Sequence, residues 1–135
     1  LITMGADVTL CGPPNLIPPF IHDLDVTVNY NLDEVIDWAD ALNVLRIQRE
    51  RMGLGLVPST REYRAMFGIT QERLEHHKKE IVIMHPGPMN RGVEIDGSVA
   101  DSDQAIILDQ VLNGVASRMA ILYLLCGGKP SEEDV

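Results

Sequence analysis

A loop rich in proline and glycine, His85-Pro86-Gly87-Pro88, directly follows the apolar run at positions 81–84. Proline has no N–H and fixes φ, so the carbonyl groups of Pro86, Gly87 and Pro88 cannot all pair within a strand ladder. A rigid loop of this kind can accept hydrogen bonds from an amine or an amide NH2 group. A stiff surface turn without chemistry is the other interpretation that these residues allow.

A second polar group, Arg46 and Gln48, follows the apolar run at positions 41–45. The guanidinium of Arg46 suits a carboxylate because it donates two parallel hydrogen bonds, and the Gln48 amide can add a further contact. Between positions 46 and 64, five arginines and two glutamates leave a net charge of +3 in a chain of net charge −9. The alternative is a solvated helix face with local Arg–Glu pairs, which the sequence favours for Arg49, Arg51, Arg61 and Arg64.

Length and composition are those of one globular domain: 135 residues, 45% of them apolar and 23% charged. We expect no membrane span, because no run of about 18 apolar residues occurs. We expect no nucleic-acid partner, because the chain is acidic. Two cysteines, Cys11 and Cys126, favour reduced thiols and a cytoplasmic location. No Cys/His spacing or glycine motif indicates a metal or a cofactor, and neither Gly53-Leu54-Gly55 nor Gly127-Gly128-Lys129 has the context of a nucleotide loop.

Short strands alternate with helices along the chain, which predicts an α/β fold: a three-layer, Rossmann-like open parallel sheet with helices on both faces and a long C-terminal helix. We expect strands at residues 6–11, 25–30, 41–45 and 81–84, the last one buried on both faces. We expect helices after Asn31, from Pro58 to Gly68, from Thr70 to about His77, and from Asp103 to about Cys126. Ligands of such sheets bind beyond the carboxyl ends of the strands, where Arg46 and the Pro86–Pro88 loop lie.

Several local details follow from residue type. Asn31 with Glu34, and Ser59 with Glu62, predict helix N-caps of the capping-box kind. Leu32, Val35, Ile36 and Ala39 mark a buried helix face, and Cys126 lies on the apolar stripe of the last helix and is expected in the core. His85 is expected to hold its loop by a structural hydrogen bond, whereas His76 and His77 are expected to be solvated. Residues 1–5 are typical of the last turn of a helix ended by Gly5, and we expect the chain to be a fragment.

Several motifs occur in an order that resembles the aspartate carbamoyltransferases, in particular the second half of their aspartate-binding domain. They include Val8-Thr9-Leu10-Cys11-Gly12-Pro13-Pro14, Leu45-Arg46-Ile47-Gln48-Arg49-Glu50-Arg51, Phe67-Gly68-Ile69-Thr70, Met84-His85-Pro86-Gly87-Pro88-Met89-Asn90-Arg91-Gly92-Val93-Glu94-Ile95 and Asn113-Gly114-Val115-Ala116. Each motif is weak alone, but the ordered set is specific and extends along nearly the whole chain.

The resemblance implies transfer of the carbamoyl group of carbamoyl phosphate to L-aspartate, which gives N-carbamoyl-L-aspartate and phosphate for pyrimidine synthesis. By likeness, Arg46 and Gln48 bind a substrate carboxylate, and the backbone of Pro86, Gly87 and Pro88 binds the carbamoyl NH2 group. No covalent intermediate, metal or cofactor is implied, and the partners are the two substrates. The stretch at residues 53–58 is expected to be a loop that closes over aspartate, or else a passive connection.

Two alternatives remain beside this interpretation. Ornithine carbamoyltransferases resemble the chain less, because they carry a Ser-Met-Gly segment in place of Arg46-Ile47-Gln48 and a His-Cys-Leu-Pro loop in place of residues 85–88. A non-catalytic subunit-interaction domain of the same fold is the other alternative. The resemblance also implies that residues 1–135 are most of an aspartate-binding domain, without its first strand and helix or the carbamoyl-phosphate domain. We therefore expect the chain alone to be inactive, and the full-length catalytic chains to form a homotrimer.

Overall fold

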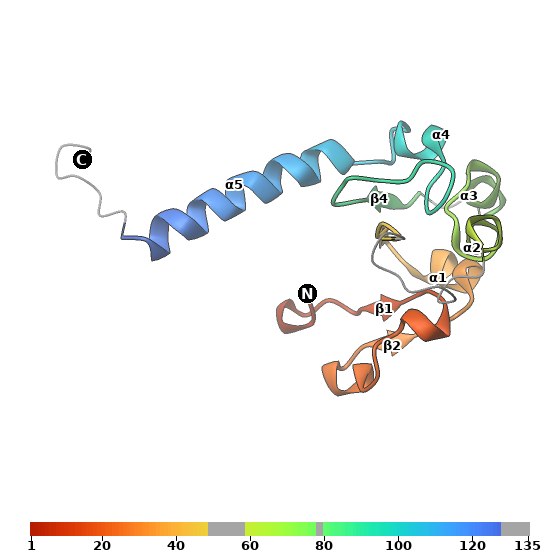
Figure 1. Ribbon diagram of the computed structural model, residues 1–135, viewed down its shortest axis with the longest axis horizontal. Helices are drawn as coiled ribbons and strands as arrows, with labels where there is room; N and C mark the ends of the chain where they lie inside the picture. The colour runs from red at the N-terminus through yellow and green to blue at the C-terminus, as the bar shows by residue number, and fades with distance from the viewer. Residues whose placement is uncertain (49–58, 78–79, 128–135) are drawn as a thin grey trace.

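The computed structural model describes residues 1–48, 59–77 and 80–127, in which helices alternate with short strands (Figure 1). The strands are β1 (Thr9–Leu10), β2 (Thr27–Val28), β3 (Ala41–Asn43) and β4 (Val82–Met84), and the helices are α1 (Leu32–Trp38), α2 (Thr60–Phe67), α3 (Gln71–His77), α4 (Gly97–Ala100) and α5 (Ile107–Leu125). Three 3-10 turns, η1 (Ile2–Met4), η2 (Pro14–Leu16) and η3 (Ile21–Leu24), complete the set. Arg49, Arg51, the 53–58 stretch and Gly128-Lys129 lie outside the described residues.

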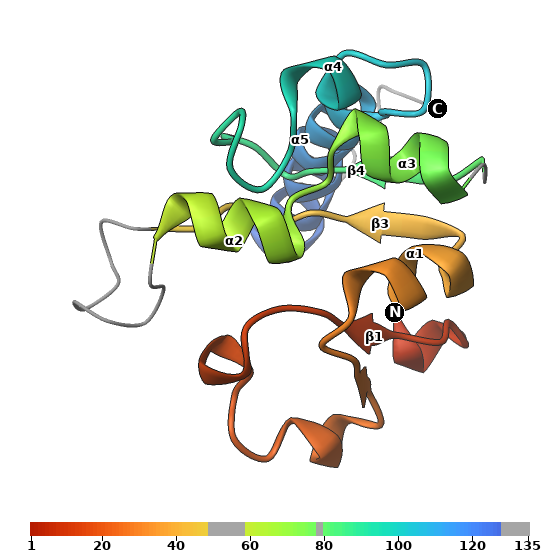
Figure 2. The same cartoon turned by 90° about the vertical axis from the view of Figure 1, so that its right-hand side faces the viewer.

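The strands pair in parallel, as the alternation of strands and helices predicts. β1 pairs with β2, and β3 pairs with β4 so that Leu42 lies opposite Ile83. The β3–β4 pair lies between α2 and α3 on one side and the start of α5 on the other (Figure 2). The predicted α/β class with parallel strands and a C-terminal helix is confirmed. The expected single open sheet, however, is divided into two hydrogen-bonded pairs among the described residues.

The core forms where α1, β3, β4 and α4 meet. Ile36, Ile83 and Val99 are completely buried, and Ile95 is 1% exposed. The predicted buried face of α1 is confirmed, since Leu32, Val35, Ile36 and Ala39 all belong to this buried set. The spacing of these four residues places them on one side of the helix, so burying them fixes how α1 packs.

Both predicted N-cap side chains accept their expected hydrogen bonds, but among the described residues neither of the two predicted capping boxes has its reciprocal bond to the glutamate side chain. Ser59 Oγ accepts a hydrogen bond from Glu62 N–H (3.1 Å) at the start of α2, and α2 ends at Gly68 as predicted. Asn31 caps α1 by accepting from Asp33 N–H (3.1 Å). The expected reciprocal bond from Glu34 to the Asn31 backbone is wrong, because that N–H donates to Asn29 Oδ1 (2.8 Å) instead. Glu34 accepts from the side-chain amides of Asn29 and Asn31.

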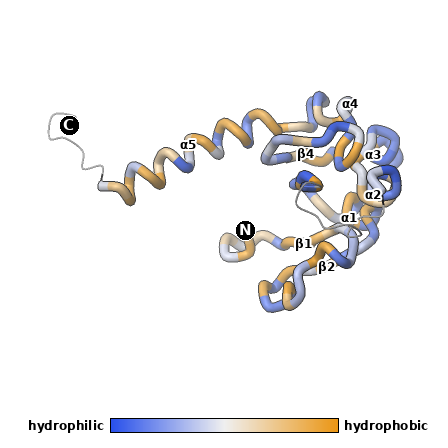
Figure 3. The backbone as a smooth tube through the Cα atoms, in the orientation of Figure 1, coloured by the Kyte–Doolittle hydropathy of each residue, from blue (hydrophilic) through white to orange (hydrophobic). Residues whose placement is uncertain are grey.

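The last helix departs most from the expectation. Of its residues, Ile107 is buried, whereas Leu108, Leu112 and Leu125 are 84%, 68% and 80% exposed. The helix extends away from the rest of the chain, and Figure 3 shows apolar residues along its length. The expected core position of Cys126 is therefore wrong, because that residue is exposed at the far end of α5.

The burial of strand β4 also differs from the expectation. Strand β4 is not buried on both faces as expected, since Val82 is 39% exposed while Ile83 is completely buried. The strand thus has one inward and one outward side, as in a sheet with a partly covered face.

No helix among the described residues is long and apolar enough to cross a membrane.

Candidate functional site

The two chemistry-bearing segments lie side by side because strands β3 and β4 end at the same edge. Asn43 lies opposite Met84 at the carboxyl ends of the two strands. The parallel pairing continues one residue further, where Val44 N–H donates to the Met84 carbonyl (2.8 Å). The chain after β3, with Arg46 and Gln48, therefore runs next to the chain after β4, with the Pro86–Pro88 loop, at the edge where ligands of parallel sheets bind.

A specific hydrogen bond joins these two segments beyond the strands. The side-chain Nδ2 of Asn90 donates to the carbonyl of Ile47 (3.0 Å), across 43 positions of sequence. Ile47 is 7% exposed, so it anchors its segment in the protein, while Gln48 beside it is exposed and Arg46 is partly exposed. The bond fixes the backbone between the two predicted carboxylate-binding side chains relative to the loop after β4.

The Pro86–Pro88 loop has the features that its residue types predict. Pro86 and Pro88 are exposed, Gly87 is partly buried with φ of +64°, and the Gly87–Pro88 peptide bond is cis. A positive φ of this size is the left-handed conformation that glycine adopts without a steric penalty. Between described residues, no hydrogen bond uses the carbonyl oxygens of Pro86, Gly87 or Pro88. These carbonyls are thus available to a donor from outside.

A buried polar pair, His85 and Glu94, supports the Pro86–Pro88 loop from the protein interior. His85 and Glu94 are both completely buried, with His85 Nε2 3.6 Å from Glu94 Oε1. Gly87 N–H donates to His85 Nδ1 (2.9 Å), which confirms the predicted structural role of His85. Burial lowers the pKa of His85, and the neighbouring Glu94 acts in the opposite direction. With Nδ1 as acceptor, the neutral ring carries its proton on Nε2, which faces Glu94.

Sequence reasoning did not single out Glu94 or Asn90. Asn90 donates to Glu94 through both its backbone N–H and its Nδ2, the latter over 3.2 Å. Both residues stand inside the motif around the Pro86–Pro88 loop, so the motif was a signal that could have pointed to them. Glutamate is rarely completely buried, which is why its residue type alone predicts a solvent-exposed position.

The remaining polar residues of interest have structural partners. Arg64 donates to both carboxyl oxygens of Asp96 at 2.8 Å, which ties α2 to the segment before α4. The predicted local Arg–Glu pair of Arg64 is therefore wrong, because its partner is an aspartate 32 positions away, although the Arg64 side chain is 44% exposed. The expectation that His77 is solvated is wrong, because its side chain is 7% exposed and lies 2.6 Å from Asp37 and 3.3 Å from Asp33.

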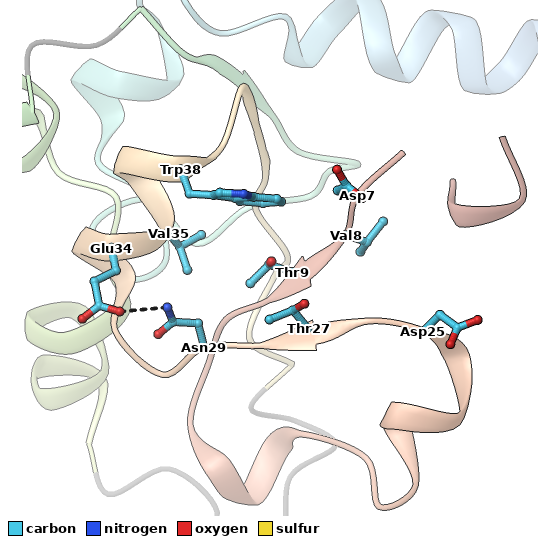
Figure 4. A pocket seen from close by; sticks show the side chains of 9 residues that line it. All are labelled: Asp7, Val8, Thr9, Asp25, Thr27, Asn29, Glu34, Val35 and Trp38. Atoms are coloured by element: carbon cyan, nitrogen blue, oxygen red, sulfur yellow. Dashed lines mark hydrogen bonds between the residues drawn. The ribbon is translucent and has the colours of Figure 1, made fainter. Parts of the chain in front are cut away.

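Two cavities lie elsewhere in the described part of the chain. One, of about 470 Å³, is lined by residues of β1, β2 and α1 (Figure 4). Its lining includes the carboxylates of Asp7, Asp25 and Glu34, with Trp38 beside them. The other, of about 650 Å³, is lined in part by His77 and its partners Asp33 and Asp37. An anionic ligand is repelled by three carboxylates, so the first cavity suits the predicted substrates poorly. Among the described residues, no group of three or more His, Cys, Asp or Glu side chains is arranged so that it could hold a metal ion.

Comparison with known proteins relates this geometry to a family. The family model described as "Aspartate/ornithine carbamoyltransferase, Asp/Orn binding domain" matches residues 1–125. The aspartate carbamoyltransferase catalytic subunit of Gemmatimonas aurantiaca is 57% identical over 131 residues, which is 97% of this chain and 41% of that protein. The chain therefore spans about two-fifths of the length of this relative.

Solved structures show the same fold. The ornithine carbamoyltransferase of Pyrococcus furiosus matches with a TM-score of 0.71 at 22% identity, covering 93% of this chain and 43% of that one. The aspartate transcarbamoylase of Trypanosoma cruzi, in complex with N-(phosphonacetyl)-L-aspartic acid, matches with a TM-score of 0.68 at 29% identity, covering 86% of this chain and 39% of that one. The fold of the described residues is thus that of the carbamoyltransferases.

Proposed function

Because the chain belongs to the aspartate/ornithine carbamoyltransferase family, we propose that it forms the L-aspartate-binding part of an aspartate carbamoyltransferase. The observation that carries the proposal is the position of two chemistry-bearing segments at one edge of the β3–β4 pair, joined by the Asn90–Ile47 hydrogen bond. One segment offers a cation and an amide, and the other offers carbonyl acceptors. Together they match two substrates: one that carries carboxylates and receives the carbamoyl group, and one that carries an NH2 group and gives the carbamoyl group up.

Arg46 and Gln48 bind the aspartate in this proposal. The guanidinium of Arg46 holds one substrate carboxylate through paired hydrogen bonds, and Gln48 positions the same group. A cationic ornithine side chain would be repelled at this position, which favours aspartate over ornithine as the acceptor. The curated relative at 57% identity is named for aspartate as well.

The carbonyls of Pro86, Gly87 and Pro88 bind the carbamoyl NH2 group and orient the attacking amine. The aspartate nitrogen attacks the carbonyl carbon of carbamoyl phosphate, so that a C–N bond forms and the C–O bond to phosphate breaks. The departing phosphate takes up the proton that the amine loses. The chain's contribution to this step is orientation, because holding two reactants in attack geometry removes much of the entropic barrier. Donors beyond the described residues are needed to stabilise the tetrahedral centre.

The larger assembly is also part of the proposal. Residues 1–135 form most of an aspartate-binding domain, a carbamoyl-phosphate domain completes the site, and the full-length catalytic chains assemble as a homotrimer. The 135-residue chain alone is then inactive, because the site is complete only with the groups of the carbamoyl-phosphate domain. A cytoplasmic location, as expected from the reduced cysteines, stays a prediction.

Replacing Arg46 in the full-length protein tests the proposal. Arg46→Ala removes a charge-assisted carboxylate contact of about 2 kcal/mol, so we expect the KM for aspartate to rise about 30-fold. The KM for carbamoyl phosphate should change less than two-fold, since the contact is made to aspartate alone. Steady-state formation of carbamoyl-aspartate with each substrate varied in turn gives both constants.

Arg61→Ala is the matched control, because Arg61 is an exposed arginine of α2 in the same basic cluster. Its replacement makes the same change of charge but should leave both KM values as they are. An unchanged aspartate KM in Arg46→Ala contradicts the role given to Arg46. A full-length protein that forms no carbamoyl-aspartate at all contradicts the function itself and favours the non-catalytic alternative.

A further inference from the structure

On the basis of the function proposed above, we propose that Asn90 is a positioning residue that sets the spacing between the aspartate-binding segment and the carbamoyl-binding loop, with buried Glu94 as its anchor. Asn90 is not expected to touch either substrate. It acts on the backbone that carries Arg46 and Gln48 and on the loop that carries Pro86 to Pro88.

The contacts of Asn90 leave its side-chain amide a single orientation. Nδ2 donates to the Ile47 carbonyl (3.0 Å) and to Glu94 Oε2 (3.2 Å), which uses both of its hydrogens. Both partners are acceptors, so a rotated amide would place its oxygen against two oxygens. The backbone N–H of Asn90 donates to the other carboxyl oxygen of Glu94. Three hydrogen bonds thus hold one residue between the two segments.

Glu94 extends the same network to the carbamoyl-binding loop. It is completely buried, and its Oε1 lies 3.6 Å from the proton-bearing Nε2 of His85. His85 in turn accepts from Gly87 N–H through Nδ1 (2.9 Å), which holds the middle residue of the loop. One buried carboxyl group therefore supports Gly87 through His85 on one side and Ile47 through Asn90 on the other.

This arrangement matters for transfer because the two reactants depend on different segments. Aspartate is held by side chains on either side of Ile47, and the carbamoyl group is held by carbonyls on either side of Gly87. A displacement of about 1 Å between the segments can lower the rate of an oriented reaction about a hundred-fold. The partly buried hydrogen bonds of Asn90 to Ile47 and to Glu94 are a rigid way to prevent such a displacement. The link from Glu94 to His85 is an electrostatic contact at 3.6 Å, because His85 Nε2 has no hydrogen-bond partner among the described residues.

The test uses the full-length protein and N-(phosphonacetyl)-L-aspartic acid. This compound carries the aspartate carboxylates for Arg46 and Gln48 and, in place of the attacking amine, an amide N–H that can donate to the loop carbonyls, so it needs both segments at the correct spacing. Asn90→Asp has the same shape as asparagine but loses both side-chain donors and places oxygen against the Ile47 carbonyl. Asn90→Ala removes the side chain without adding a repulsion. For each variant we expect the Kd of this compound, measured by calorimetry, to rise about ten-fold or more, because a buried acceptor loses its partner. The Kd of carbamoyl phosphate alone should change less than two-fold.

Arg91→Ala is the matched control in the same loop. Arg91 is half exposed, and its guanidinium pairs with Asp101 (2.6 Å) rather than with either segment. This variant should bind both ligands like the original protein. The melting temperature of every variant is measured in parallel, and Asn90→Ala serves as the test if Asn90→Asp does not fold.

Each outcome decides for or against the proposal. A higher Kd for N-(phosphonacetyl)-L-aspartic acid, together with an unchanged Kd for carbamoyl phosphate, supports the proposal. If Asn90→Asp binds the compound with the Kd of the original protein, the proposal is overturned, because the shape of the side chain is then sufficient and its hydrogen bonds are not needed. An equal loss for both ligands also overturns it, since that result indicates general structural damage. Failure of the unmodified protein to bind the compound or form carbamoyl-aspartate instead contradicts the proposed function, which separates the two conclusions.

Discussion

Replacing His77 should lower the free energy of unfolding by an amount that depends on pH. The imidazole of His77, on α3, lies 2.6 Å from Asp37 and 3.3 Å from Asp33, both on α1. Hydrogen bonds to these carboxylates raise the pKa of His77, with the bond to Asp37 as the largest cause. Arg73, also on α3, lies 2.8 Å from Asp33 and shares that carboxylate. His77→Ala removes the contacts of the imidazole with α1 and leaves the Arg73–Asp33 pair between the same two helices.

The expected magnitude follows from the geometry and the exposure. A hydrogen bond to a charged group contributes about 1.5–3 kcal/mol when it is shielded from water. Asp37 and Asp33 are 67% and 51% exposed, so solvent screening reduces this contribution. We expect His77→Ala to lower the free energy of unfolding by about 1 kcal/mol at pH 6.

The sign of the pH dependence is determined by the direction of the pKa shift. Because the pKa of His77 is higher in the folded than in the unfolded protein, the contribution is fully present below the unfolded value of about 6.5. It is lost as the pH rises through the raised folded-state pKa. The difference between the original protein and His77→Ala should therefore shrink from pH 6 toward pH 8.

Urea unfolding of the full-length protein at several pH values measures this difference, and NMR titration of the His77 ring measures its pKa directly. His76→Ala is the control, because His76 is the exposed neighbouring histidine on the same helix. It should show no comparable pH dependence relative to the original protein. A difference between His77→Ala and the original protein that grows with rising pH, or a His77 pKa below 6.5, would refute the reasoning.

Two further predictions concern the backbone. Gly87→Ala should lower the free energy of unfolding by about 1–2 kcal/mol and lower kcat, because alanine disfavours φ of +64° although its Cβ meets only Val111 at 3.8 Å. Gly12→Ala, where the added Cβ has open space, is the control in the same melting and rate measurements. Ser59→Ala should cost about 1 kcal/mol in urea unfolding, because α2 loses the N-cap bond to Glu62, whereas Ser59→Asp keeps an acceptor and should cost less. Equal stability of the two Ser59 variants would contradict the capping role.

Much of the secondary structure was predictable, because its signals act over a few residues. The apolar spacing of α1, the Ser59 cap and the end of α2 at Gly68 are all confirmed. The identity of the loop at Pro86 to Pro88 and its position after a strand were equally readable, since proline and glycine restrict the backbone locally. The roles of Arg46 and Gln48 came from resemblance to a family and stay predictions.

Long-range partners were not predictable, because they depend on which segments the fold brings together. His77 meets Asp37 across 40 positions, Arg64 meets Asp96 across 32, and Asn90 meets Ile47 across 43. The apolar stripe of α5 shows the same limit: its periodicity predicts a buried face, but burial requires a neighbour, and only its beginning packs against β4. Burial of Glu94 is the clearest case, since a carboxyl group enters the interior only where hydrogen-bond donors such as Asn90 already surround it.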